Sequence, residues 1–293
     1  MNILVIGGSR NIGYYASLRF LEAGHTVTFA LRNLSVFDND AQVQPYLQSG
    51  KAHLVKCDAL VRDDVQRAWT AAASHSDSGA VDILLFTVGG TPKFHLTKGF
   101  VISPPNLVTQ SLLNALSTLP SPSSQSSPSS RPRIITISST GLTRTSHAAL
   151  PCPLKPLYAY LLASPHRDKV GAERVVSHLA GWPWNTAEDG EPVPEVLDPR
   201  GAWKDGEGMP AEGALKGDVL VVRPALLTDG ECLAEKGHEG EGEGNKEGTR
   251  AYRVSEEELG GWTVSRRDVA HFVVDAALNR WEEYRGKRVS IAY

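Results

Sequence analysis

The sequence predicts an α/β fold in which helices cover both faces of a parallel sheet. Apolar, β-branched runs alternate with segments of helical periodicity from the first residue to about residue 140. Most of these runs are apolar throughout, which indicates strands that are buried on both faces. The 293 residues are many for one ordinary domain and few for two, so we expect a single domain, residues 1–293, with insertions.

The first half of the chain supplies five strands and three helices in alternation. Residues 2–6 are apolar and end at Gly7 and Gly8, and residues 14–23 have helical spacing and stop at Gly24. Apolar runs predict the other strands at 25–31, 52–55, 81–87 and 133–137. Alanine content or helical spacing of apolar residues predicts the other helices at 65–73 and 105–116.

The alternation continues after residue 140, with interruptions. We predict helices at 165–179 and 266–280, the second with Ser265 as its N-cap, and strands at 218–223 and 289–292. Because parallel strands are joined by right-handed crossovers, this order leaves few topologies other than a doubly wound, Rossmann-type sheet.

Three insertions break the pattern, and the C-terminal ones are expected to form a small region on the substrate side of the sheet. Residues 120–132 are almost wholly Ser and Pro, and residues 229–250 are rich in Glu and Gly, so both are expected to be flexible. Residues 182–217 also have a flexible composition but carry three tryptophans. This insertion either folds over a pocket as a lid or simply packs on the surface.

Composition excludes several classes of function. A formal net charge of −3 argues against nucleic acid as a main partner, and no apolar run reaches the roughly 20 residues that span a bilayer. The first residues, MNILVIGG, are a strand rather than a signal peptide. Three dispersed cysteines and scattered histidines suggest neither disulfides nor a metal site. We therefore expect a reduced, cytoplasmic protein.

A glycine-rich turn follows the first strand and opens the first helix. Glycine permits a tight turn and a close approach of the helix to the sheet, and the helix N-terminus then faces a diphosphate. Strand, turn and helix occur in the order that a dinucleotide site requires. The expected contacts are Gly7, Gly8, Ser9, Arg10, Asn11, Ile12 and Gly13.

The end of the second strand predicts which dinucleotide binds. Sites for NAD carry an acidic residue there, which binds the ribose 2′-hydroxyl, whereas this chain has Arg32. A guanidinium binds a 2′-phosphate through charge-assisted hydrogen bonds, and Arg10 can reach the same group. We therefore expect NADP(H). The alternative is that Arg32 is only a solvated charge at a strand end.

Further cofactor contacts are expected after the third and fourth strands. Asp58, beside Ala59, either accepts a hydrogen bond from the adenine amine or caps the following helix. Thr87, Val88 and Gly89 have little bulk and leave room for the cofactor at the carboxyl edge of the sheet.

These residues resemble the short-chain dehydrogenase/reductase superfamily. The turn is similar to its TGxxxGxG motif, with Asn11 at the place of the middle glycine, and residues 137–141 (ISSTG) look like its fifth strand. The resemblance implies a catalytic role for Ser139. It also implies a Tyr four residues before a Lys, but Pro165 stands four residues before Lys169, so the usual catalytic Tyr is missing.

A more specific resemblance is to the atypical, NmrA-like and NAD(P)H-binding branch, which includes flavin and biliverdin reductase relatives. Three motifs carry it: residues 166–173 (HRDKVGAE), residues 222–230 (VRPALLTDG) and residues 264–270 (VSRRDVA). The branch holds reductases, isomerising enzymes and cofactor-sensing regulators, so it implies a fold and a cofactor rather than a substrate.

The resulting hypothesis is an NADPH-dependent oxidoreductase that transfers hydride to a small organic substrate, namely a carbonyl, quinone or flavin. Lys169 would bind the nicotinamide ribose, and Ser139 would hydrogen-bond the substrate. Tyr158 or Tyr160 is the candidate proton donor in place of the missing Tyr, and His166 is another. A non-catalytic NADP(H) sensor with a protein partner, or a redox-neutral isomerase or cyclase, remains an alternative.

Overall fold

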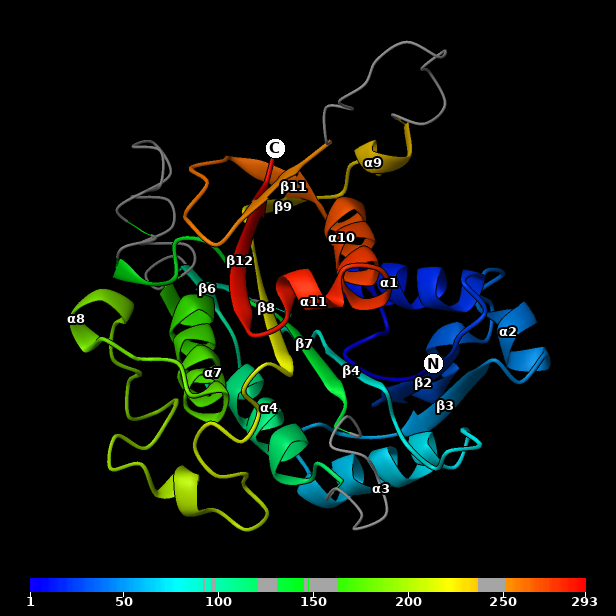
Figure 1. Cartoon of the computed structure of the whole chain (residues 1–293), viewed down its shortest axis with the longest axis horizontal. Helices are drawn as coiled ribbons and strands as arrows, with labels where there is room; N and C mark the ends of the chain where they lie inside the picture. Colours follow the sequence, from blue (N-terminus) through cyan, green and yellow to red (C-terminus); the bar gives the residue numbers. More distant parts are fainter. Residues whose placement is uncertain (92, 96–98, 121–130, 145–146, 148–162, 237–250) are drawn as a thin grey trace.

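A computed structural model describes residues 1–91, 93–95, 99–120, 131–144, 147, 163–236 and 251–293 (Figure 1). Its centre is an eight-stranded sheet, in which every pair of neighbouring strands is parallel except the pair at one edge. This arrangement confirms the Rossmann-like α/β fold. The strands, in their spatial order, are β10 (Arg253–Ser255), β12 (Lys287–Ala292), β8 (Val219–Pro224), β7 (Arg133–Ile137), β4 (Ile83–Phe86), β1 (Asn2–Ile6), β2 (Thr26–Leu31) and β3 (Ala52–Lys56).

The strand order reverses at β1, which lies between β2 and β4. The chain first winds outward through β2 and β3, then crosses over to β4 and continues toward β12. At such a switch point, the loops after β1 and β4 leave the sheet in opposite directions and open a crevice at its carboxyl edge. The glycine-rich turn stands at this crevice.

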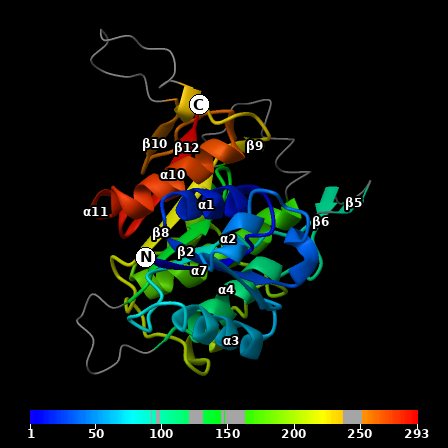
Figure 2. The same cartoon turned by 90° about the vertical axis from the view of Figure 1, so that its right-hand side faces the viewer.

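Helices cover the two faces of the sheet and create two apolar cores. On one face, α1 (Asn11–Glu22), α10 (Arg266–Leu278) and α11 (Trp281–Tyr284) pack with the short α2 (Gln44–Gln48) and the 3₁₀ turn Leu34–Phe37. On the other face lie α3 (Arg62–Ala73), α4 (Leu107–Ser117) and α7 (Ala163–Ala180). Figures 1 and 2 show both layers.

The predicted strands and helices all occur, with ends that differ by a few residues. The helix expected at 14–23 starts at Asn11, and the helix expected at 65–73 starts at Arg62. Both begin in polar residues, where apolar periodicity gives no signal. Ser265 caps α10 as predicted, because its side chain accepts a hydrogen bond from the Asp268 N–H.

Several short elements have no counterpart in the sequence prediction. The strands β5 (Lys93–His95) and β6 (Gly99–Val101) form a hairpin that projects from the body (Figure 2). A second small sheet pairs β9 (Leu226–Thr228) with β11 (Thr263–Ser265) in parallel. Strands of three residues are too short to produce a readable periodicity.

The insertion at 182–217 is described throughout, with α8 (Thr186–Asp189) and a 3₁₀ turn at Ala202–Asp205. Val196, Leu197 and Leu215 are buried in the core that contains α7. Trp203 packs edge-on against His178 of α7. These are the contacts of a segment that packs on the surface of α7. Most of the other two insertions lies outside the described residues.

Candidate active site

The glycine-rich turn is pressed against the end of β4. Gly7 has φ +97°, and a Cβ on it would lie 2.6 Å from the carbonyl carbon of Thr87. A Cβ on Gly13 would lie 2.3 Å from Thr87 Oγ1, which itself donates to the Gly7 carbonyl at 3.1 Å. Any larger residue would force the turn away from the sheet. The bare backbone therefore lines the crevice closely, as an approaching diphosphate requires.

The start of α1 leaves its N–H groups available. Its N-cap, Arg10, is extended and makes no capping side-chain hydrogen bond, and the first turn contains no acidic residue. Asn11 has φ +57°, a left-handed conformation that Asn tolerates better than most residues. Asn11 thus does at this position what the expected glycine would do. Ser9 is half-buried beside it, and Ile12 is buried beneath the turn.

Positive charge gathers beyond β2. Arg32 is exposed, and among the described residues its guanidinium has no hydrogen-bond or ion-pair partner. Lys56, at the end of β3, donates to the Arg32 carbonyl and adds a second cation at this edge. Arg10 is also exposed, and its guanidinium donates to Thr91 Oγ1 at 2.5 Å. Sequence reasoning missed Lys56, because only the pairing of β2 with β3 brings it beside Arg32.

The Asp58 carboxylate takes part in a local turn. Its Oδ1 accepts from the Leu60 N–H at 3.0 Å, while the N-cap of α3 is Val61 and has no capping side chain. Asp58 therefore precedes the helix without capping it. The neighbouring Ala59 carbonyl accepts from Asn114 of α4.

The residues after β4 are small where the crevice opens. Val88 packs against the core of the α3, α4 and α7 face. A Cβ built on Gly89 would meet nothing within 4 Å. This edge of the sheet therefore has free space beside the glycine-rich turn.

Lys169 lies on α7 and reaches the end of β7. Its Nζ donates to the Ser138 carbonyl at 2.8 Å. Burial lowers the pKa of Lys169 to about 8, although the Glu173 and Asp168 carboxylates oppose that shift. A small pocket adjoins it, lined by residues of α4, β7 and α7, including Thr136, Ser138, Lys169 and Glu173.

Ser138 and Ser139 have different surroundings. The Ser138 hydroxyl is buried and donates to the Glu173 carboxylate. The Ser139 hydroxyl is half-buried and, among the described residues, donates only locally, to the Thr140 carbonyl at 3.1 Å. Ser139 is thus the serine whose hydroxyl can turn to a substrate. The resemblance pointed to Ser139, and no local signal in the sequence indicates that the Ser138 hydroxyl meets Glu173.

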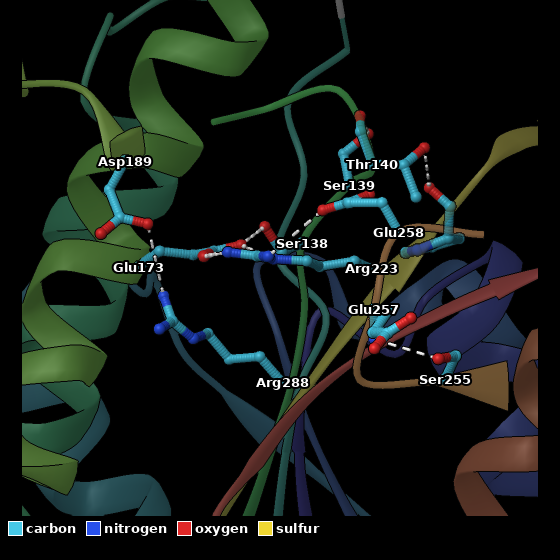
Figure 3. A network of polar contacts seen from close by, with 11 residues as sticks. Ser138, Ser139, Thr140, Glu173, Asp189, Arg223, Ser255, Glu257, Glu258 and Arg288 are labelled. Carbon is cyan, nitrogen blue, oxygen red and sulfur yellow. Dashed lines mark hydrogen bonds and ion pairs between the residues drawn. The ribbon is translucent and has the colours of Figure 1, made fainter. Parts of the chain in front are cut away.

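Glu173 and Arg223 form a buried ion pair beside these serines. Glu173 Oε1 accepts from Arg223 Nε at 3.0 Å, and Oε2 accepts from Arg223 Nη2 (Figure 3). Glu173 lies in the motif at residues 166–173 and Arg223 in the motif at residues 222–230. Nothing in either motif indicates that the packing of α7 against β8 brings the two side chains together.

Asp168, in the motif at residues 166–173, holds α7 and α4 together. Its carboxylate accepts from the Val108 and Thr109 N–H groups at 2.7 and 2.9 Å, and so caps the start of α4 from α7. Burial raises the pKa of Asp168, and these hydrogen bonds oppose the rise. Asp168 thus fixes α7, and with it Lys169, against α4.

Of the other three candidate proton donors, the structure describes only His166. Tyr158 and Tyr160 lie outside the described residues. Pro165 occupies the first turn of α7, so the usual position of the catalytic Tyr carries no acid–base group. Burial, followed by the charges of Lys169 and His147, lowers the pKa of His166 to about 3. His166 is therefore neutral at physiological pH and a poor proton donor.

Comparison with known proteins agrees with this geometry. Residues 1–141 match the short chain dehydrogenase family. The match covers just under half of the 293 residues, so this part of the chain is similar to the short-chain dehydrogenases. The atypical branch within that superfamily is not distinguished by the match.

The chain is also similar to a curated protein and to solved structures. It is 32% identical over 166 residues to the reductase pytE of Aspergillus terreus, and the match covers 55% of this chain and 48% of that protein. The chain thus matches about half the length of this relative.

A short chain dehydrogenase from Burkholderia cenocepacia, in complex with NADP, has a TM-score of 0.56 at 14% identity, covering 99% of this chain and 96% of that one. ChuY, an anaerobillin reductase from Escherichia coli O157:H7, has a TM-score of 0.53 at 15% identity, covering 99% and 96%. At such identities, the likeness shows the fold.

Two further properties concern the described residues alone. None of their helices is long and apolar enough to cross a membrane. Among the same residues, no three His, Cys, Asp or Glu side chains are grouped as ligands for a metal ion. The described cysteines, Cys57 and Cys232, are free and buried.

Proposed function

We propose that the protein is an NADPH-dependent oxidoreductase that reduces a small organic substrate, namely a carbonyl, quinone or flavin. One observation supports this proposal above the others. The uncapped start of α1 and the close-packed glycines face a crevice whose rim carries Arg10, Arg32 and Lys56. This combination suits NADP(H), which has a diphosphate and a 2′-phosphate, better than it suits NAD(H), which has the diphosphate but lacks the 2′-phosphate.

The chain's own residues supply binding and orientation. The cofactor supplies hydride from its nicotinamide ring when it is bound. Lys169, at the carboxyl edge, would donate to the nicotinamide ribose hydroxyls, and the Ser139 hydroxyl would donate to the substrate oxygen. With a quinone or flavin, water can deliver the accompanying proton, so these substrates need no Tyr at position 165.

Oxidation of NADPH with a panel of quinones, flavins and ketones tests the proposal. Turnover above background with one class identifies the substrate class, and Lys169→Met should abolish most of it. Exposed Lys51, which precedes the amino end of β3, provides a control, because Lys51→Met should leave the rate unchanged.

Pro165 favours a second candidate, a non-catalytic sensor of NADP(H) that passes its state to a protein partner. The sensor binds NADPH and turns over nothing on the panel. A third possibility, an isomerase or cyclase, converts its substrate without any net loss of NADPH. Measuring binding, NADPH consumption and product together separates the three functions.

A further inference from the structure

The carboxylate of Glu173 is the centre of a buried polar network. Glu173 is 3% exposed, and its two carboxylate oxygens accept hydrogen bonds from the Ser138 hydroxyl and from two nitrogens of Arg223. The three residues come from α7, the end of β7 and β8 (Figure 3). The network therefore joins the three elements that meet beside Lys169.

The ion pair between Glu173 and Arg223 is well satisfied. Burial alone would raise the pKa of Glu173, but the Arg223 guanidinium and its hydrogen bonds hold it below its usual range. Glu258, in the segment between β10 and β11, lies 3.6 Å from the same guanidinium. Figure 3 shows Glu258 on the side of Arg223 that faces Ser139 and Thr140.

Ser138 connects this ion pair to Lys169. Its hydroxyl donates to Glu173, its N–H donates to the Val222 carbonyl at 2.7 Å, and its carbonyl accepts from Lys169 Nζ. All three of its polar groups are thus engaged. Ser138 holds the end of β7 in one position relative to α7, and Ser139 follows directly from it.

Lys169 and Glu173 both lie on α7. They are four residues apart, so they lie one above the other on the same face of the helix. Asp168 and His166 are the other titratable residues of α7 that bear on Lys169, and β7 presents only the neutral Ser138 carbonyl to it. Of the two described carboxylates that oppose the lowering of the Lys169 pKa, Glu173 and Asp168, Glu173 has the larger effect.

We propose that Glu173 and Arg223 are positioning residues of the reaction site: the pair fixes Ser138, whose carbonyl oxygen in turn accepts a hydrogen bond from the half-buried Lys169 ammonium. The proposal rests on the proposed function only in assigning Lys169 to the site. A buried ion pair contributes little net stability over an apolar pair of similar volume, so stability is a poor reason for its presence. Arg223 has a separate task, since it directs the carboxylate toward Ser138.

The titration of Lys169 tests the proposal without any cofactor. In protein labelled with ¹³C,¹⁵N-lysine, the Cε–Nζ resonance of Lys169 is assigned by its loss in Lys169→Met. Its midpoint is then measured in the unmodified protein and in Glu173→Gln. We expect the midpoint to move to lower pH in Glu173→Gln, because the opposing anion is lost.

Two further variants keep the test decisive. The double variant Glu173→Leu with Arg223→Met removes both charges together, and so folds even if Glu173→Gln leaves Arg223 unpaired. Its Lys169 midpoint should also move to lower pH. Glu258→Gln, which alters the same guanidinium without contacting Ser138, should leave the midpoint unchanged. An unchanged midpoint in both Glu173 variants would overturn the proposal.

A kinetic readout applies once a substrate is known. The pH profile of kcat should then move in the same direction as the Lys169 midpoint in the double variant. Absence of NADPH turnover in the unmodified protein would count against the proposed function alone, because the titration does not depend on it.

Discussion

Arg32 is the residue on which the proposed preference for NADPH depends. Its guanidinium is exposed at the end of β2, and Lys56 is fixed beside it by a hydrogen bond to its carbonyl. No carboxylate occupies the place where an NAD site would hold the ribose 2′-hydroxyl. A phosphate at this place would meet two cations, and a hydroxyl would gain little from either.

Replacement of Arg32 by Ala should weaken NADPH binding by about 1.5–3 kcal/mol, roughly 10- to 100-fold, and NADH binding very little. Titration calorimetry of both nucleotides measures the difference. Lys51→Ala is the control, because Lys51 is an exposed cation that precedes the amino end of β3, at the far end of the strand from Lys56. Equal losses for the two nucleotides would contradict a contact with the 2′-phosphate.

Asn11 combines a strained backbone with a side chain that tolerates it. At φ +57°, Ala lacks the compensating polar side chain, whereas Gly adopts this conformation readily. We expect Asn11→Ala to lower the free energy of unfolding by about 1 kcal/mol and Asn11→Gly to change it little. Urea denaturation compares the two, and a greater loss in the Gly variant would show that the Asn side chain, rather than φ, matters.

Among the larger elements, the insertion at 182–217 packs on the surface of α7 and places a few apolar side chains in the core. Its apolar residues join the core around α7, and Arg288 of β12 lies over the Trp182 ring at 5.3 Å. The segment thereby reaches Arg288 of β12 on the side where α7 carries Glu173. Asp189 of α8 lies 3.7 Å from the Arg288 guanidinium on the same side (Figure 3).

Two glycines of this insertion form a matched pair for testing its docking. Both have positive φ, but a Cβ on Gly208 would lie 2.2 Å from the Ser117 carbonyl of α4, whereas a Cβ on Gly190 would meet nothing within 4 Å. Gly190→Ala should lower the free energy of unfolding by about 1–2 kcal/mol through backbone strain alone. Gly208→Ala should cost at least about 1 kcal/mol more, because backbone must move. Equal urea midpoints would mean that the insertion does not hold this contact in solution.

At the scale of the whole molecule, partly buried histidines make the fold sensitive to acid. Burial is the main cause that lowers the pKa of His25, His53, His166, His178 and His271. The unfolded chain, with histidine pKa values near 6.5, therefore binds protons more tightly than the folded chain. Stability from these groups is complete above about pH 6.5 and is lost as the pH falls toward their folded values.

His166, with a pKa of about 3, should contribute most, at up to about 1.4 kcal/mol for each pH unit below 6.5. Urea unfolding at pH 7.5, 6.5 and 5.5 measures the loss, which should be smaller in His166→Gln than in the unmodified protein. Glu173 does not interfere, because its lowered pKa adds a loss only below about pH 4.5. Parallel pH dependences in the two proteins would contradict the assignment to His166.

The sequence determined the features that depend on neighbours along the chain. Fully apolar runs predicted β1, β7 and the other central strands, because a strand buried on both faces needs apolar residues at every position. The glycine-rich turn and the cap of α10 were readable because each is formed by residues within one or two turns of backbone.

Only the tertiary structure decided which distant groups meet. Ser138, Glu173 and Arg223 are 35 and 50 residues apart, and Lys56 reaches a carbonyl 24 residues away. The periodicity of apolar residues contains no information on these long-range contacts, because they depend on how α7 packs on β7 and β8 and on which strands pair. The sequence therefore determined where a dinucleotide could lie, and the packing of α7 against the sheet decided which side chains surround the reaction site.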